Sequence, residues 1–406
     1  MTDRTAVSSA DTSRLSPLHD IHVEAGASFT DFAGWQMPVR YSSELEEHHA
    51  VRTAAGLFDL SHMAEIIVAG PEAGAALDFA LSNRVSATAV GQAKYSLLLS
   101  AEGGIVDDVI VYRTHENRFG IVANAGNRAA AAGALSARAS GFDTTVVDES
   151  DSLALIAVQG PAALRVLQDL AGLELDLPLG ELRYYRSTVA QWAGNEVLLA
   201  RTGYTGEDGF ELYVVNAVAP RLWRELIEAG APHGLVPAGL ACRDTLRLEA
   251  GMPLYGHELG LDVRPAEAGL GRVVTLDGSK GDFVGREALE AAEQTPDALG
   301  RVLVGLRSEG RRAGRAGYAV LDGDRVVGEV TSGALSPTLG HPIAMAFVEA
   351  GSAQPGTELA IDVRGKAMPA SVTELPFYRR PKPGAPNPDT AKPDTPSRNT
   401  ATGDAS

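Results

Sequence analysis

The hydrophobic periodicity of this chain changes once, and that change limits the folds open to it. Before about Leu289, short β-like runs such as Ile105–Tyr112 alternate with segments of helical period such as Pro237–Ala250. From Arg301 to Phe377 the helical period disappears, and short alternating runs are separated by turn pairs. We therefore predict an α+β region followed by a small closed barrel or sandwich of strands.

The two ends of the chain differ from the region between them. Residues 1–14 are rich in Ser, Thr and Asp without a periodic pattern, and residues 381–406 hold many prolines but no Val, Ile, Leu, Met or aromatic residue. Neither end could bury enough apolar surface to offset its loss of conformational entropy. We predict a disordered leader over 1–14, an α+β domain over 15–296, a β-domain over 297–380 and a disordered Pro-rich tail over 381–406.

The length and charge of the chain exclude several classes of protein. Its 406 residues suffice for two or three domains. It carries 35 Lys and Arg against 52 Asp and Glu, and the net charge of −17 disfavours binding to nucleic acid. The first residues lack the apolar run of a signal peptide, and no stretch reaches the ~18 apolar residues of a spanning helix. The lone cysteine, Cys242, excludes an internal disulfide. We expect a cytoplasmic protein that binds neither nucleic acid nor membrane.

Two adjacent carboxylates inside a β-like run are the first candidates for chemistry. Asp107 and Asp108 lie within the segment Gly103 to Tyr112. Successive side chains of a strand point to opposite faces, so Asp108 should share its face with Val106 and Tyr112, and the two acids cannot form a facing pair. Strands disfavour Asp, so at least one of the two should be held by hydrogen bonds or used in function. Capping of the turn after the glycines is the alternative.

The second candidate is the glycine-rich segment Arg201–Tyr213. No Lys-Ser or Lys-Thr pair follows its glycines and no helical pattern begins there, which argues against a phosphate-binding loop. The alternation after the loop predicts a strand with Glu211 on the face opposite Phe210. A glycine-rich hairpin with a solvated Glu is the alternative.

The third candidate is the predicted helix Pro237–Ala250, which should end at Gly251. Arg243 and Arg247 lie one turn apart on it and could together grip a carboxylate of an anionic ligand. Surface ion pairs along the helix are the alternative. The nine histidines show no spacing typical of a metal site, and Cys242 fits a small buried hydrophobe, so we predict no metal.

Taken together, these segments resemble the T-protein family of the glycine cleavage system, the tetrahydrofolate-dependent aminomethyltransferases. The resemblance runs in order from about Ser16 to Tyr378. It implies a bilobed folate-binding aminomethyltransferase domain over 15–296, followed by a small C-terminal β-barrel domain over 297–380. The motifs that carry it are Phe32–Val39, Phe58–Met63, Gly103–Tyr112, Gln159-Gly160-Pro161, Arg201–Glu211, Arg243–Gly251 and Thr331-Ser332-Gly333.

The resemblance also implies the residues of the site. Asp108 matches the catalytic carboxylate; because an ordinary Asp has a pKa of about 3.9, it should be anionic and act mainly through its charge. Glu211 suits the amide N–H and amino group of a pterin ring, and Arg243 suits the glutamate tail of folate. The residues that match folate contacts are Tyr95, Tyr112, Asn124, Tyr204, Glu211, Arg243 and Arg379.

The implied reaction transfers the methylene of an aminomethyl group to tetrahydrofolate and releases ammonia. The aminomethyl group would arrive on the lipoyl arm of a carrier, the H protein of the glycine cleavage system, so the lipoyl group acts in trans. A folate-dependent demethylase of a small methylated amine or sulfonium compound is one alternative. A non-enzymatic folate-binding iron–sulfur maturation factor is another, but its Lys-Gly-Cys-Tyr-type motif corresponds here to Arg201–Tyr204, which has no cysteine.

Overall fold

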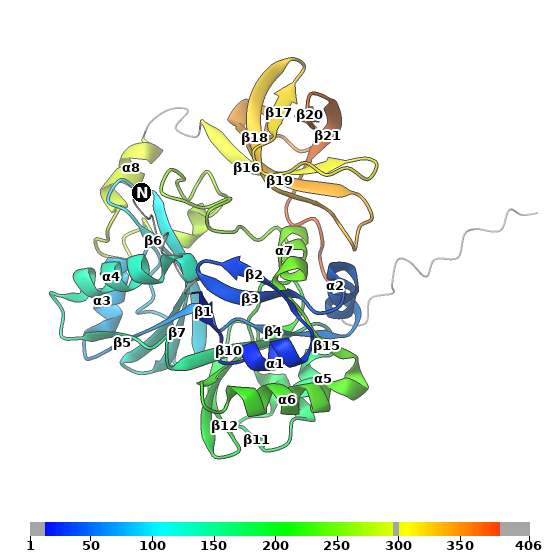
Figure 1. Ribbon diagram of the computed structural model, residues 1–406. Helices are drawn as coiled ribbons and strands as arrows, with labels where there is room; N and C mark the ends of the chain where they lie inside the picture. Colours follow the sequence, from blue (N-terminus) through cyan, green and yellow to red (C-terminus); the bar gives the residue numbers. More distant parts are fainter. Residues whose placement is uncertain (1–12, 295–299, 382–406) are drawn as a thin grey trace, which may run out of the picture.

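The computed structural model describes residues 13–294 and 300–381. The predicted boundary at 296/297, most of the predicted leader and nearly all of the predicted tail lie outside the described residues; Arg14, expected in the leader, begins a short strand. Within the described part, the strands form a seven-stranded sheet, a five-stranded sheet, a three-stranded sheet and a closed barrel (Figure 1). The two larger sheets are the centres of two lobes.

The seven-stranded sheet has the order β11-β12-β13-β14-β10-β4-β15. Helices α5 (Ala163–Gln168) and α6 (Ala219–Gly230) pack on one of its faces. Helix α6 does so because Leu222, Trp223 and Leu226 recur at helical spacing and are all buried. The strands are β4 (Ala55–Asp59), β10 (Leu153–Gln159), β11 (Leu173–Glu174), β12 (Ser187–Trp192), β13 (Asn195–Ala200), β14 (Gly209–Val215) and β15 (Leu235–Pro237).

The five-stranded sheet has the order β6-β7-β8-β5-β9. Helices α3 (Ala73–Ala80) and α4 (Arg128–Ala139) cover its outer face, where Leu77 and Leu135 pack in one cluster with Val109 and Val111. The strands are β5 (Ala64–Ala69), β6 (Gln92–Leu99), β7 (Ile105–His115), β8 (Arg118–Ala123) and β9 (Thr145–Asp148).

The inner faces of the two sheets pack against each other. One buried cluster joins Phe58 and Tyr213 of the larger sheet to Ala93 and Tyr112 of the smaller one. Phe210 instead belongs to the cluster beneath α5 and α6, so the prediction that Glu211 faces away from Phe210 is confirmed. Side chains on these inner faces are therefore held between two sheets, each backed by helices.

The N-terminal segment and the remaining helices connect these lobes. The hairpin of β2 and β3 turns at Ala33 and Gly34, whose positive φ angles of 53° and 81° suit a two-residue hairpin turn. The elements are β1 (Arg14–Leu15), α1 (His19–Glu24), β2 (Ser28–Phe32), β3 (Trp35–Arg40), α2 (Glu44–Thr53), α7 (Leu240–Glu249), α8 (Arg286–Glu293) and the 3-10 turns Ala125–Asn127, Leu179–Glu181, Ala231–His233, Gly271–Val273 and Ala350–Ser352.

The C-terminal region is a closed barrel of order β16-β19-β18-β17-β20-β21. The prediction of an α+β region followed by a β-barrel is confirmed, and a barrel forms rather than a sandwich. Strand β21 contains Pro369, a residue that would mark a sequence run as a poor strand. The strands are β16 (Arg301–Ser308), β17 (Ala319–Asp322), β18 (Arg325–Leu335), β19 (Pro342–Glu349), β20 (Glu358–Asp362) and β21 (Ala367–Thr373).

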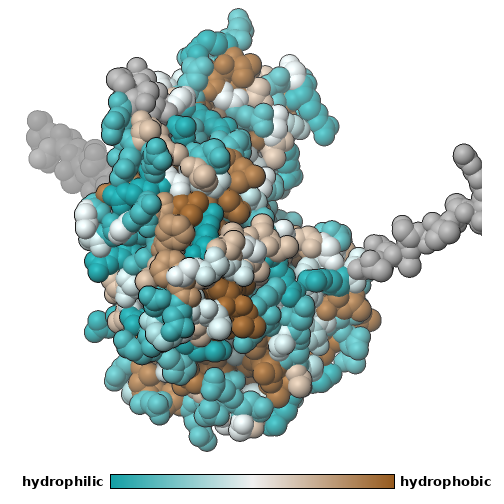
Figure 2. All heavy atoms as spheres, turned by 90° about the vertical axis from the view of Figure 1, so that its left-hand side faces the viewer, coloured by the Kyte–Doolittle hydropathy of each residue, from teal (hydrophilic) through white to brown (hydrophobic). Residues whose placement is uncertain are grey.

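Helix α7 joins the barrel to the lobes. Its Leu248 packs with Ile343 and Met345 of β19, while its Cys242 and Leu246 pack in the cluster between the two sheets. Hydrophilic residues cover most of the face seen in Figure 2, where hydrophobic residues gather only in small groups. No helix in the described residues is long and apolar enough to cross a membrane.

Candidate active site between the two lobes

Glu211 lies on the inner face of β14 and its carboxylate is fixed by three hydroxyl groups. Its Oε2 accepts hydrogen bonds from Tyr112 Oη at 3.0 Å, from Tyr213 Oη at 3.4 Å and from the hydroxyl of Thr202. Its Oε1 has no hydrogen-bond partner among the described residues. One oxygen is thus held rigidly by the protein, while the other keeps its acceptor capacity for a ligand.

Asp107 and Asp108 lie on β7 and share one partner. Asn124, at the end of β8, donates from Nδ2 to Oδ1 of both acids at 2.7 Å each. Asp108 Oδ2 accepts from Tyr95 Oη at 3.0 Å. Asp107 is fully buried and also accepts from Asn127 Nδ2 at 2.7 Å. The expectation that at least one of the two acids is held by hydrogen bonds is confirmed for both.

A β-bulge at Val106 changes one detail of this strand. Leu98 pairs with Asp107 and Leu99 with Ile105, which leaves Val106 as the extra residue. The side chain of Val106 therefore packs with the outer cluster beneath α3 and α4, and the prediction that it shares the face of Asp108 is wrong. A bulge shifts the alternation by one residue, and the β-branched run around it gives no sign of the shift.

Burial and the neighbouring groups shift the protonation of both acids. Burial and the neighbouring charge of Asp108 raise the pKa of Asp107 to about 7. Burial also raises the pKa of Asp108, but its hydrogen bonds from Tyr95 and Asn124 oppose that rise. Near neutral pH Asp107 is therefore partly protonated, while the hydrogen bonds from Tyr95 and Asn124 favour the charged form of Asp108.

Arg243 on α7 has no carboxylate partner in the part of the chain that the structure describes. Its guanidinium carbon lies 4.8 Å from the centre of the Tyr204 ring, and its Nη1 is buried without a hydrogen-bond partner among the described residues. Burial lowers its pKa, although Tyr204 and Glu211 act in the opposite direction. Because a buried donor without a partner is costly, this guanidinium is suited to an anionic ligand.

Arg247, one turn further on α7, does not join Arg243. Its Nε donates to Asp244 Oδ1 at 2.8 Å, its Nη1 to Glu258 Oε2 at 3.0 Å and its Nη2 to Ser332 Oγ at 2.7 Å. The prediction that the two arginines grip one carboxylate together is therefore wrong. Arg247 instead connects α7 to β18 of the barrel.

Most of the predicted site residues fall into three groups, and the members of each group contact one another. Arg379 belongs to none of these groups. Tyr95, Asp108 and Asn124 form one group, Tyr112 and Glu211 a second, and Tyr204 and Arg243 a third. The charge of Asp108 helps to raise the pKa of Tyr204, so the groups lie within electrostatic range of one another. Arg379 is exposed and makes no hydrogen bond or ion pair with any residue that the structure describes.

The structure adds Tyr185 to this neighbourhood. Burial and the charges of Tyr184, Glu211 and Asp108 raise its pKa, so its hydroxyl lies in the field of both carboxylates. Its φ of 60° is unusual for a residue other than glycine. The sequence pattern gave no sign of Tyr185, because it lies in an irregular loop without periodicity.

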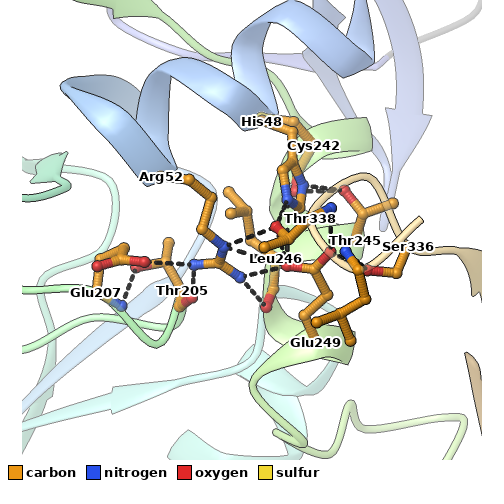
Figure 3. Close-up of polar contacts among 11 residues, drawn as sticks. His48, Arg52, Thr205, Glu207, Cys242, Thr245, Leu246, Glu249, Ser336 and Thr338 are labelled. Carbon is orange, nitrogen blue, oxygen red and sulfur yellow. Dashed lines mark hydrogen bonds and ion pairs between the residues drawn. The ribbon is translucent and has the colours of Figure 1, made fainter. Parts of the chain in front are cut away.

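A buried polar network lies beside the third group. Arg52 of α2 reaches Glu207 of the glycine-rich loop and Glu249 of α7, and His48 and Thr338 complete the network (Figure 3). The network holds the pKa of Glu249 at about 2, since its hydrogen bonds and the charges of His48 and Arg52 outweigh burial. Among the described residues, no group of three or more His, Cys, Asp or Glu side chains is arranged to hold a metal ion.

Two family models match this chain. The GCVT N-terminal domain matches residues 18–278, and the glycine cleavage T-protein C-terminal barrel domain matches residues 301–379. An aminomethyltransferase of Cutibacterium acnes is 58% identical over 91% of this chain and 99% of its own length. One of Streptomyces avermitilis is 56% identical over 92% of this chain and 100% of its own length. The crystal structure of the glycine cleavage system aminomethyltransferase T from Bartonella henselae superposes with a TM-score of 0.83 at 38% identity, covering 91% of this chain and 99% of that one.

Proposed function

Because this chain belongs to the glycine cleavage T-protein family and is an aminomethyltransferase, we propose that it transfers a methylene group from a protein-bound aminomethyl group to tetrahydrofolate. The observation that carries the proposal is the pair of free groups in the site. Among the residues that the structure describes, one oxygen of Glu211 and one buried donor of Arg243 have no partner. A folate presents a donor pair at its pterin end and carboxylates at its tail, which complement these two groups.

The pterin end would bind at Glu211. The amide N–H and amino group of the ring would donate to its carboxylate, which Tyr112, Tyr213 and Thr202 hold in one orientation. Tyr112 is fully buried, so we assign it to positioning Glu211 rather than to stacking on the ring. Tyr95 and Tyr204 keep part of their surface accessible and offer flat faces to the ligand.

The tail would bind at Arg243, with Arg379 as a second cation at the surface. The guanidinium of Arg243 is already oriented by the ring of Tyr204, which reduces the entropy lost when a carboxylate binds. Asn124 would contribute mainly by holding Asp108 in place.

Asp108 would act through its charge. In the reaction, the C–N bond of the aminomethyl group breaks and releases ammonia, and N5 of tetrahydrofolate attacks the methylene. The C–S bond to the lipoyl sulfur breaks, N10 closes the ring, and the sulfur and the ammonia take up the protons that N5 and N10 lose. Positive charge develops on the methylene during this sequence, and the carboxylate of Asp108, which forms no ion pair with any described residue, stabilises it.

The donor would be a lipoylated carrier, the H protein of a glycine cleavage system, acting in the cytoplasm. The relatives from Cutibacterium acnes and Streptomyces avermitilis are named aminomethyltransferases and align with this chain over 99% and 100% of their own length, which supports this donor over the free methylated amine or sulfonium compound of a demethylase. The absence of cysteine from Arg201–Tyr204 argues against an iron–sulfur maturation factor.

Single-turnover transfer tests the proposal. The protein is mixed with tetrahydrofolate and either an aminomethylated lipoyl carrier or free dimethylglycine, sarcosine or a sulfonium compound, and methylene-tetrahydrofolate and ammonia are measured. We expect rapid formation of both products only from the carrier. Faster transfer from a free methylated compound would replace the proposal with the demethylase alternative.

A further inference from the structure

Arg52 is a buried cation that the proposed transfer does not use. It belongs to α2, far in sequence from the predicted site residues, and its side chain is only 4% exposed. Figure 3 shows its guanidinium between the glycine-rich loop on one side and α7 on the other. A buried guanidinium with several partners fixes the geometry of the segments that it joins.

Arg52 holds the loop that carries Tyr204. Its Nη1 donates to the carbonyl oxygen of Thr205 at 2.7 Å and to Glu207 Oε1 at 3.1 Å. Thr205 follows Tyr204 directly, so a shift of this carbonyl moves the tyrosine backbone with it. The loop also approaches the end of α7 closely at Gly206, since a Cβ at this glycine would lie 2.9 Å from the Cβ of Ala250.

The same guanidinium holds α7, which carries Arg243. Its Nη2 donates to Glu249 Oε2 at 2.8 Å and to the carbonyl oxygen of Leu246 at 3.3 Å. Leu246 lies one turn after Arg243, and Thr205 directly follows Tyr204. Arg52 therefore joins the loop and the helix close to the two residues that stack, Tyr204 and Arg243. Arg52 thereby sets the separation between Tyr204 and Arg243.

The C-terminal segment meets Arg52 on a third side. The ring centre of Tyr378 lies 4.1 Å from the guanidinium carbon, and the Tyr378 amide donates to the carbonyl oxygen of Glu249 at 2.8 Å. Arg379 follows Tyr378 directly. The segments that carry Tyr204, Arg243 and Arg379 therefore converge on one cation, whereas Glu211 is held by other groups.

We propose that Arg52 is a positioning residue for the tail end of folate, since it keeps the segments of Tyr204, Arg243 and Arg379 at a fixed separation. The inference rests on the proposed function, because the ligand tail is that of tetrahydrofolate. A lysine cannot replace the arginine, since one ammonium lacks the planar set of donors that reaches Thr205, Leu246 and both carboxylates.

His48 supplies a matched control within the same network. Its Nδ1 lies 2.8 Å from Thr245 Oγ1 and its Nε2 lies 2.9 Å from Thr338 Oγ1, so it joins α2 to α7 and to the barrel. Its Nε2 also lies 3.2 Å from Glu249 Oε2, but among the described residues His48 makes no hydrogen bond, ion pair or ring contact with the glycine-rich loop. His48→Gln should therefore lower stability without changing the position of Tyr204.

The experiment measures two dissociation constants for the wild type and for Arg52→Lys, Glu207→Gln and His48→Gln. One ligand is tetrahydrofolate; the other is tetrahydropteroate, which lacks the glutamate tail. We expect about tenfold weaker binding of tetrahydrofolate to Arg52→Lys, a smaller loss for Glu207→Gln, and little change for tetrahydropteroate. His48→Gln should keep the wild-type ratio of the two dissociation constants, even if its melting temperature falls as much as that of Arg52→Lys.

Several outcomes would overturn the inference. It fails if Glu207→Gln and a folded Arg52→Lys keep the wild-type ratio, or if His48→Gln changes the ratio as they do. If Arg52→Lys does not fold, Glu207→Gln decides alone. Failure of the wild type to bind tetrahydrofolate would refute the proposed function. In that case, hydrogen exchange of the backbone amides of residues 203–208 tests whether Arg52 holds the loop. Glu207→Gln must speed this exchange and His48→Gln must not.

Discussion

Replacing Asp108 by Asn separates the charge of this side chain from its shape. In the folded protein Asp108 accepts one hydrogen bond from Tyr95 and one from Asn124. An asparagine keeps one acceptor, so one hydrogen bond to a charged group is lost, which costs about 1.5–3 kcal/mol. Loss of the charge also removes two destabilising effects, the repulsion between Asp108 and Asp107 and the cost of burying a charge, and this partly offsets the lost hydrogen bond. The variant should therefore fold, with a stability change of no more than about 2 kcal/mol.

The effect on the transfer should be much larger. Without the carboxylate, positive charge at the transferring methylene loses the counter-charge that Asp108 supplies, and the proposed role of Glu211 at the pterin ring leaves it no substitute. Removing one such preorganised electrostatic contact typically costs about 3–4 kcal/mol of transition-state stabilisation, or about 10²–10³-fold in rate. We expect a loss of this size in single-turnover transfer from the loaded carrier.

Asp107→Asn is the matched control. Asp107 accepts hydrogen bonds from the amide of Asn124 at 3.0 Å and from the side chains of Asn124 and Asn127 at 2.7 Å each, but it has no contact with Tyr95. Its pKa of about 7 means that it is partly neutral in the wild type. Its replacement should therefore slow transfer by no more than about tenfold, through a less well held Asn124.

Thermal melts of both variants establish that folded protein is compared with folded protein. An equal loss of transfer rate in folded Asp107→Asn and folded Asp108→Asn would refute the assignment of the charge to Asp108. A full rate in Asp108→Asn would refute the electrostatic role itself.

Three further predictions concern ligand and pH. Tetrahydrofolate at a hundredfold excess over its dissociation constant should stabilise the wild type by about 2.7 kcal/mol, and Arg243→Ala should reduce this gain in a thermal-shift assay and lose the preference for folates with a glutamate tail. The pKa of Glu249 is lowered to about 2, so its contribution is present above pH 4.5 and fades as the pH falls toward 2; the stability difference between wild type and Glu249→Gln, measured by urea unfolding, should shrink over that range. The pKa of Asp107 is raised to about 7, so its ionisation lowers stability as the pH rises from about 4 to 7. The melting temperature of Asp107→Asn should therefore rise relative to that of the wild type over this interval. In either pH series, a difference between variant and wild type that stays constant would contradict the assignment.

The sequence was sufficient to predict the class of fold, and it singled out the carboxylates that the structure places between the lobes, because both depend on local pattern or on motifs. The strand with Glu211 opposite Phe210 followed from alternation over a few residues. The bulge at Val106 could not be predicted, because neighbouring β-branched residues fit either register. Arg52 could not be predicted either, since its partners come from segments about 150 to 290 residues away along the chain, which is information that only the tertiary structure holds.

Arg243 and Arg247 show how the tertiary structure separates residues that the sequence treats alike. Both lie on one helix, one turn apart, and both are removed in large part from solvent. Arg247 finds acceptors for its donors in Asp244, Glu258 and Ser332, so an arriving carboxylate would have to displace existing bonds. Within residues 13–294 and 300–381, Arg243 contacts the face of Tyr204, and its buried Nη1 lacks an acceptor, at a cost of about 1–3 kcal/mol. A ligand carboxylate removes that cost when it binds, so in this chain of net charge −17 the unpaired arginine, and not the better bonded one, is the residue suited to bind an anion.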